Sequence, residues 1–286
     1  MNTLGRSLAG TLLVLACSAA AVAQTNPPPP VLQITREFTK PGKNGTVHEK
    51  AESAFVQAMT KAKWPTHYVG MTSLSGKMRC LFLTRYESYE AWEKDTAAIA
   101  KNEALSAALD RAQEADGALL DEVDQGVFVF HEEMSLRTMS DISKQRYLDI
   151  SAYHVKPGHR KEWEEAVKLV KAAYEKGVPS AHWGMYEQMY GGDGGTFVVL
   201  TARKTLAELD QNPMNGKAYA EAMGEEGMRK LNDLVEKSIE SSQHQLFAFN
   251  PKMSYVEDSW IKSDDFWKVK PAATPAAKPA AEAKKP

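Results

Sequence analysis

The chain carries an internal repeat, and this repeat constrains the fold more than any other feature of the sequence. An offset of 116 residues places residues 32–35 on residues 148–151, and it places Lys-Pro-Gly at 40–42 on Lys-Pro-Gly at 156–158. Later segments match at offsets of 117 and 119 residues. A slowly growing offset is what short loop insertions produce, so we expect two copies of one structural unit.

Each copy is predicted to run strand, helix, strand, strand, helix, strand, because apolar patterns of period 2 and period 3.6 follow one another in it. In the first copy, strands are expected near 31–38, 67–73, 77–85 and 126–134, and helices near 45–62, 88–100 and 103–123. In the second copy, strands are expected near 147–155, 182–190, 196–202 and 243–250, and helices near 159–176, 206–209 and 215–238. This order is the βαββαβ ferredoxin-like unit. The sequence therefore predicts an α+β fold of two tandem units, at 31–135 and 147–254, joined by a linker at 136–146.

The first 23 residues have the pattern of a secretory signal peptide. Arg6 supplies a positive n-region, an apolar stretch follows, and residues 21–23 read Ala-Val-Ala, an A-x-A cleavage pattern. Cleavage there removes Cys17 and leaves Cys80 as the only cysteine, so no internal disulfide can form. We expect an exported protein in a bacterial periplasm, with a lipoprotein attached through Cys17 as the alternative.

The remaining segments outside the repeat differ in composition. Residues 24–30 are rich in proline and are expected to form an extended linker. Residues 255–270 contain Trp260, Phe266 and Trp267, so this extension is expected to pack on the barrel. Residues 271–286 are almost entirely Ala, Pro and Lys, a composition that cannot form a core and predicts a disordered tail.

Charge and hydropathy exclude two classes of partner. The chain has 35 Lys and Arg against 37 Asp and Glu, without a long basic block, so it lacks the basic surface that nucleic-acid binding requires. No run of apolar residues reaches the ~18 needed for a transmembrane helix. We predict neither a nucleic-acid partner nor a membrane span.

The Pro-Gly that follows the first strand of each copy, with a helix opening at 156–164, resembles the dimeric α+β barrel superfamily. Members include antibiotic-biosynthesis-type monooxygenases, NIPSNAP-like proteins, and haem-degrading or chlorite-dismutase-like enzymes. The resemblance covers about residues 31–254 and implies that two ferredoxin-like sheets pair into one eight-stranded barrel. Here one chain supplies both sheets, because each sheet has a second face to bury. A second chain is therefore not required, although a homo-oligomer is compatible with this fold.

The alternation along the first strand of each copy suggests a polar barrel lining. If the apolar residues Leu32, Ile34, Leu148 and Ile150 face the helices, the residues between them face the interior. These are Gln33, Thr35, Glu37, Tyr147, Asp149, Ser151 and Tyr153. Such a set either lines a ligand cavity or forms a hydrogen-bonded network across the interior. We take Glu37, Tyr147 and Ser151, with Trp183, as candidate ligand-binding residues.

Three histidines are candidate functional groups. His67 and His182 open the second strand of their copies, each followed by an aromatic residue, and could carry protons together with Tyr153 or Asp149 because imidazole titrates near neutral pH. His154 ends a strand and is a candidate axial haem ligand. His48 and His159 lie near helix starts and are expected to face solvent. Apart from haem no cofactor is predicted, and without H-E-x-x-H or Cys/His ligand spacing no metal site is predicted.

Three functions remain open on the sequence. The first is an exported small-molecule-binding barrel without catalysis. The second is a cofactor-independent monooxygenase or haem-related enzyme, which fold analogy alone supports. The third is a structural or assembly protein whose proline-rich ends engage partners.

Overall fold

The computed structural model describes residues 27–138 and 141–269. The first half contains β1 (Val31–Thr39), α1 (Thr46–Ala62), β2 (Tyr68–Ser73), β3 (Arg79–Tyr86), α2 (Tyr89–Lys101), α3 (Glu103–Gly117) and β4 (Leu120–Leu136). The second contains β5 (Tyr147–Val155), α4 (Arg160–Gly177), β6 (Trp183–Tyr190), β7 (Thr196–Arg203), α5 (Asn212–Ser238) and β8 (Ile239–Phe249), followed by α6 (Asp258–Ser263). The predicted signal peptide with Cys17 and the predicted tail at 271–286 lie outside the described residues.

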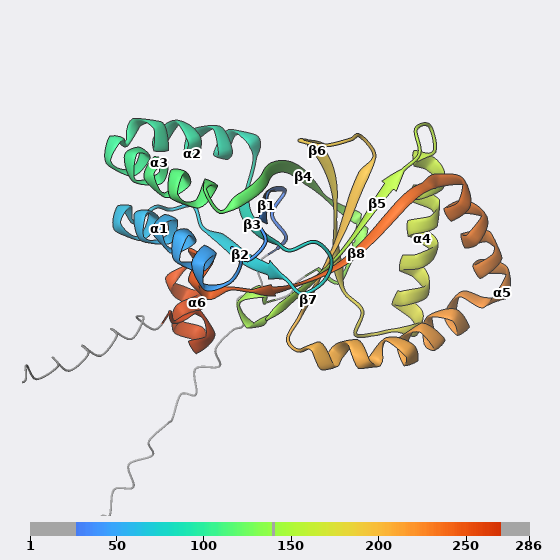
Figure 1. The fold of residues 1–286 in the computed structure, drawn as a ribbon. Coiled ribbons are helices and arrows are strands. Elements are labelled where there is room, and N and C mark those ends of the chain that lie inside the picture. Colours follow the sequence, from blue (N-terminus) through green and yellow to red (C-terminus); the bar gives the residue numbers. More distant parts are fainter. Residues whose placement is uncertain (1–26, 139–140, 270–286) are drawn as a thin grey trace, which may run out of the picture.

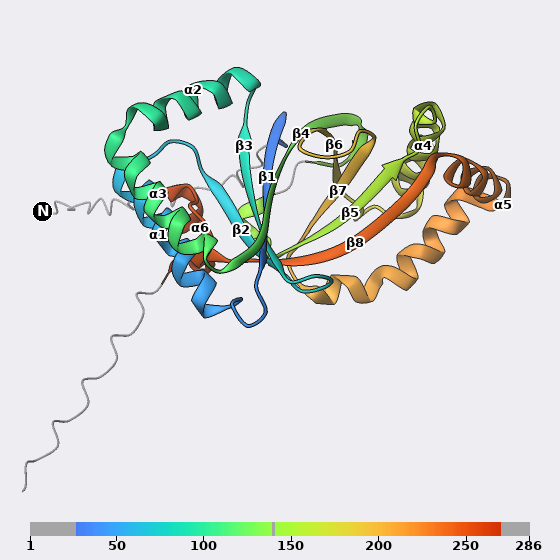
Figure 2. The same ribbon diagram turned by 45° about the horizontal axis from the view of Figure 1, so that its top comes forward.

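The eight strands form one closed antiparallel barrel in the order β1-β3-β2-β8-β5-β7-β6-β4 (Figure 1). The first half contributes the order β4-β1-β3-β2 and the second contributes β8-β5-β7-β6, so equivalent strands hold equivalent places. Pairing of β2 with β8 and of β4 with β6 closes the barrel. Helices α1, α2 and α3 flank the barrel on one side and α4 and α5 on the opposite side, while α6 lies on the side of α1 (Figure 2). None of the described helices is long and apolar enough to cross a membrane.

The largest differences from the sequence prediction are at two element boundaries. The helix expected over 103–123 ends at Gly117, and the strand expected from residue 126 begins at Leu120. The added residues pair with the end of β1, where Thr39 lies opposite Leu120 and Phe38 lies opposite Glu122. The backbone N–H and C=O groups at the end of β1 need hydrogen-bond partners on a neighbouring strand. The local helical pattern contains no information on this long-range pairing.

The two faces of the strands are the reverse of those expected. Leu32, Ile34, Leu148 and Ile150 belong to one core cluster that includes Phe128 and Phe247 and draws on strands of both halves, so they point into the barrel. The interior of a closed barrel meets only other side chains, and it is therefore the most apolar surface of the fold. Alternation identifies two faces but does not say which one the helices cover.

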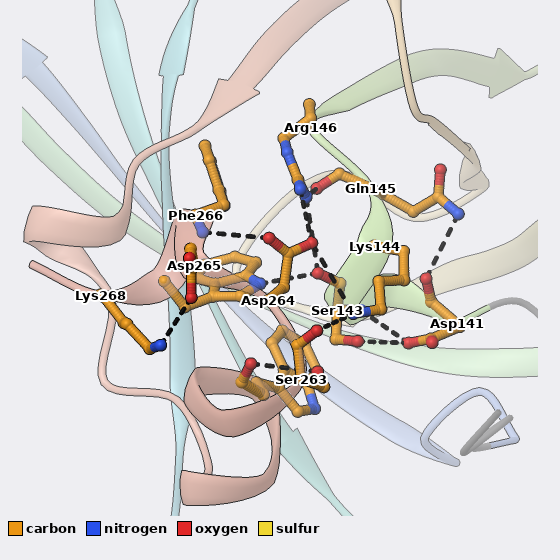
Figure 3. A network of polar contacts seen from close by, with 12 residues as sticks. Asp141, Ser143, Lys144, Gln145, Arg146, Ser263, Asp264, Asp265, Phe266 and Lys268 are labelled. Atoms are coloured by element: carbon orange, nitrogen blue, oxygen red, sulfur yellow. Dashed lines mark hydrogen bonds and ion pairs between the residues drawn. The ribbon is translucent and has the colours of Figure 1, made fainter. Parts of the chain in front are cut away.

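The C-terminal extension is part of the core. Trp267 is 2% exposed and packs in the same cluster as the barrel interior, together with Val256. The segment before β5 holds this extension in place (Figure 3), since Trp267 Nε1 donates to the carbonyl of Ser143 at 2.7 Å and Arg146 pairs with Asp264 at 2.5 Å. Lys144 also donates to the carbonyl of Ser263. Residues 141–146 are therefore a packed strap in this structure, in contrast to the linker predicted there.

Candidate functional site

A cavity of about 180 Å³ opens at one end of the barrel. Its strand residues come from the starts of β1, β2, β5 and β6 and from the ends of β3, β7 and β8, which antiparallel pairing brings to the same end. The walls are apolar and come from both halves: Leu32, Val69, Leu83, Leu148, Tyr186, Leu200, Ala202 and Phe249. Neither half alone encloses this cavity.

Segments outside the strands close the cavity. Val256 and Trp260 from the C-terminal extension line it, as does Ile142 from the strap. Residues 27–29, three prolines, also line it. The proline-rich sequence predicts an extended linker here, and in this structure the prolines lie against the cavity, where their apolar rings cover its walls.

Arg85 is the positively charged side chain that lines the cavity. It lies opposite Leu32 in the β1–β3 ladder, so its side chain shares the interior face with that leucine. Its side chain is 33% exposed, and its ion pair is with the exposed Glu87 at 3.7 Å. An exposed pair at this separation contributes little. The guanidinium therefore keeps most of its hydrogen-bonding capacity for a ligand.

His67 also lines the cavity and is held by stacking. Its ring lies 4.7 Å from the ring of Tyr255, at an interplanar angle of 18°. Burial lowers the pKa of His67 from its usual 6.5, and this effect exceeds the opposing influence of the Glu257 carboxylate. The imidazole is therefore neutral at neutral pH and can accept a proton.

His182 and Trp183 lie at the same cavity, but their polar atoms are engaged by the backbone. His182 Nε2 lies 2.8 Å from the carbonyl oxygen of Ala202, and Nδ1 lies 3.1 Å from that of Ser180. Carbonyls only accept hydrogen bonds, so the structure does not support the predicted proton-carrier role of His182. Trp183 Nε1 donates to the carbonyl of Met134 at 2.9 Å, which leaves its ring as an apolar wall.

The other predicted site residues are on the helix-facing side of the strands. Glu37 Oε2 lies 3.2 Å from His48 Nε2 on α1, and the ring of Tyr153 lies 5.2 Å from that of Trp163 on α4. Two others lie on the face of β5 that Tyr153 shares: Asp149 pairs with Arg203 at 3.0 Å and Ser151 contacts His244 at 2.8 Å. Tyr147 lies on this face too. These residues do not line the cavity, because the strand faces are reversed.

His154 does not fit the role of a haem ligand. Its Nδ1 lies 3.3 Å from the Thr196 hydroxyl, and its Nε2 lies 3.3 Å from the Glu240 carboxylate. It ends β5, at the opposite end of the strand from Leu148, and does not line the cavity. A cavity of about 180 Å³ is also below the ~300 Å³ at which pockets for drug-sized ligands begin. We therefore assign no haem to this cavity.

Several polar residues of the cavity were not predicted from the sequence, among them Arg85 and Tyr186. Arg85 shares strand parity with Leu81 and Leu83, and a charged residue on an otherwise apolar strand face was a usable signal. Tyr186 is 3% exposed, and its hydroxyl has no hydrogen bond among the described residues. Burial raises the pKa of Tyr186, so the hydroxyl stays protonated and can donate.

No family model matches the chain, and no curated protein sequence matches it. Among solved structures, a protein provisionally described as a monooxygenase from Fusobacterium nucleatum is similar at 12% identity over 78% of this chain and 93% of that chain, with a TM-score of 0.48. An anthrone oxidase-like protein is similar at 12% identity over 80% and 94%, with a TM-score of 0.47. A mutant chlorite dismutase from Candidatus Nitrospira defluvii is similar at 11% identity over 79% and 92%, with a TM-score of 0.44. Because these TM-scores are below 0.5, we assign no activity from these neighbours.

Proposed function

We propose that the protein is a small-molecule-binding α+β barrel whose cavity takes a ligand with one aromatic ring and an anionic group. The observation that carries the proposal is the pairing of apolar walls from both halves with Arg85 inside one cavity of about 180 Å³.

Volume sets the size of the ligand. An apolar cavity of about 150 Å³ in a protein core is large enough for benzene. The present cavity is slightly larger, at about 180 Å³, and its walls include the rings of Tyr186, Phe249 and Trp260. A single ring with one short substituent therefore fits, whereas a fused polycyclic compound does not.

Charge sets the substituent. Arg85 can bind a carboxylate through two parallel hydrogen bonds, and Tyr186, which lines the same cavity, carries a further hydrogen-bond donor. Asp141 and Glu257 also line the cavity, but each accepts a hydrogen bond from a nearby serine hydroxyl, Ser143 and Ser259 respectively. Arg85 is on the interior face of β3, whereas Asp141 and Glu257 come from the strap and the C-terminal extension at the cavity edge.

Benzoate and its neutral analogue benzyl alcohol test this proposal by calorimetric titration. Arg85→Gln should weaken benzoate binding by about 10- to 100-fold, the worth of a hydrogen bond to a charged group, and leave benzyl alcohol binding unchanged. Arg203→Gln, which removes an arginine outside the cavity that pairs with Asp149, is the matched control. Ala202→Leu should abolish binding of both probes by filling the cavity. Equal benzoate affinity in the wild type and Arg85→Gln would refute the assignment of Arg85.

A second candidate function is a cofactor-independent monooxygenase, and His67 favours it. A half-buried, neutral imidazole in the cavity is placed to take a proton from a phenolic or acidic carbon–hydrogen group of a bound ligand. In that case His67→Gln should abolish turnover of a bound aromatic substrate in the presence of oxygen while leaving its affinity nearly unchanged. Purification from the natural host, followed by native mass spectrometry and absorption spectroscopy, would reveal a retained compound.

We further propose that the chain is a fused pair of ferredoxin-like units of the dimeric α+β barrel superfamily and that it is exported after cleavage behind Ala23. The equal strand order of the two halves supports the first proposal. The N-terminal sequence pattern supports the second. Light scattering should detect the folded monomer in solution, because one chain closes the barrel. N-terminal sequencing of the secreted chain should begin at Gln24.

A further inference from the structure

A second group of functional side chains lies away from the cavity, between the sheet and the helices of the first half. Glu37 comes from β1, His48 and Glu52 come from one face of α1, and Asp116 comes from the end of α3. One nitrogen or oxygen atom from each of the four lies within 4.8 Å of the others. Both views show α1 and α3 side by side (Figures 1 and 2). The fold thus brings three segments that are distant in sequence to one point.

The four converging atoms are buried and lack hydrogen bonds. The side chains of His48, Glu52 and Asp116 are 1%, 3% and 3% exposed, and that of Glu37 is 12% exposed. His48 Nε2, Glu37 Oε2, Glu52 Oε1 and Asp116 Oδ1 have no hydrogen-bond partner among the described residues. His48 Nε2 lies 3.2 Å from Glu37 and 3.1 Å from Asp116 without the alignment that a hydrogen bond needs. Buried polar atoms in this state call for an occupant.

The charge balance points in the same direction. Three carboxylates would bring three negative charges together in a buried space, and a single imidazolium would offset only one of them. A divalent cation at the point where they converge would balance two of these charges.

We propose that Glu37, His48, Glu52 and Asp116 bind one divalent first-row transition-metal ion. Donors at about 2.1 Å from a tetrahedral ion are about 3.4 Å apart. Two of the three separations at His48 Nε2 are close to this value, and the third, to Glu52 Oε1, is 4.0 Å. An imidazole nitrogen among carboxylates suits zinc, manganese or iron better than magnesium or calcium, which prefer oxygen donors alone.

Neighbouring residues support the donor set. His48 Nδ1 lies 3.4 Å from the sulfur of the buried Cys80, so the imidazole is held with Nε2 directed toward the carboxylates. Metal-binding histidines commonly have such a partner on the other nitrogen. The hydroxyl of Tyr68 is buried without a hydrogen-bond partner among the described residues, and its pKa is raised first by burial and then by the charges on Glu52 and Glu37.

The role that follows is structural. Four protein donors with little exposure form a closed site, which is typical of structural ions rather than catalytic ones. The ion would join β1, α1 and α3, and it does not depend on the ligand proposed for the cavity. Metal binding should therefore raise the melting temperature of the folded chain.

The test uses the mature, untagged chain, stripped with a chelator and then dialysed against Zn²⁺, Mn²⁺ or Co²⁺ separately. The number of metal ions per chain is measured by inductively coupled plasma mass spectrometry. Binding of Co²⁺ is followed by visible absorption. Glu52→Gln and Asp116→Asn each remove one donor with little change in shape. Glu49→Gln is the matched control, because it removes a carboxylate from the same helix that pairs with Lys252 rather than with the cluster.

We expect one ion per chain and a metal-dependent rise in melting temperature for the wild type and Glu49→Gln. Glu52→Gln and Asp116→Asn should lose at least about 100-fold in affinity. X-ray absorption of the Zn²⁺-loaded wild type should show one imidazole nitrogen among oxygen donors, a result that needs no variant to fold. A wild type that binds none of the three ions, or donor variants that bind them as tightly as the wild type, would overturn the proposal and leave a protonated network as the state of the cluster.

Discussion

Replacing Trp267 with alanine should strongly destabilise the protein, because this residue anchors the C-terminal extension in the barrel core. The indole ring lies 4.9 Å from the ring of Phe266, 5.2 Å from that of Trp260 and 6.0 Å from that of Phe249. Truncation of a buried tryptophan costs about 3 to 5 kcal/mol. The carbonyl of Ser143, which accepts from Nε1, loses its partner and adds about 1 kcal/mol.

The expected total of about 4 to 6 kcal/mol corresponds to a fall in melting temperature of roughly 10 to 20 °C for a chain of this size. Differential scanning calorimetry measures it directly. Trp267→Phe keeps most of the ring contacts and loses the donor, so it should cost about 1 to 2 kcal/mol, while Trp260→Ala should cost less than Trp267→Ala because Trp260 is only partly buried. A melting temperature for Trp267→Ala within about 3 °C of the wild type would refute the view that the extension belongs to the core.

Three further perturbations test other parts of the structure. Gly191→Ala should lower the free energy of unfolding, measured by chemical denaturation, far more than Gly76→Ala. Both glycines have positive φ, but only at Gly191 would the new Cβ meet a backbone atom, the carbonyl oxygen of Gln125 at 1.9 Å. Equal effects of the two substitutions would contradict this close approach. The pKa of His67 in the folded chain is lowered from 6.5, so the unfolded chain takes up a proton first as the pH falls below about 6.5. The free energy of unfolding should therefore decrease over this pH range. A His67→Gln variant whose free energy of unfolding has the same pH slope would exclude His67 as the cause. Arg137 donates to the carbonyls of Val178 and Ala181 and to that of Glu175 at the end of α4. Arg137→Ala should therefore lower the free energy of unfolding by about 2 kcal/mol and increase hydrogen exchange at that helix end. Unchanged exchange would argue against a capping role.

The sequence predicted the order of elements well, because that order depends on local periodicity. The strands near Leu32 and Leu148 and the helices that follow them begin and end within a few residues of the expected positions. The predicted start of β4 was wrong because it depends on pairing with β1 over a long sequence separation. Local patterns contain no information on such pairing.

The candidate site was less predictable, for a different physical reason. A period of two separates Glu37 from Leu32 and Ile34 but does not state which face is covered by helices and which closes the barrel. Choosing the wrong face placed Glu37 and Tyr153 in the interior, although Glu37 contacts α1 and Tyr153 contacts α4. His67, His182 and Trp183 line one cavity because they stand at the strand ends, where location depends on strand direction rather than on face.

The buried cluster was missed although part of its signal was local. His48 and Glu52 are four residues apart on one helix face, a spacing at which two side chains meet one ion. The sequence analysis expected His48 to face solvent because it stands near a helix start, yet its side chain is 1% exposed. Glu37 and Asp116 join it only through the fold, so the complete donor set could not be read from spacing.

A crystal structure of the protein soaked in benzoate shows directly whether the barrel end binds a ligand. We expect electron density for one ring between Leu83 and Leu200, with the carboxylate directed toward the guanidinium of Arg85 and the walls unchanged. A cavity that is filled by rearranged side chains, or benzoate bound elsewhere with this cavity free of it at saturating concentration, would contradict the claim that the barrel end is a ligand site.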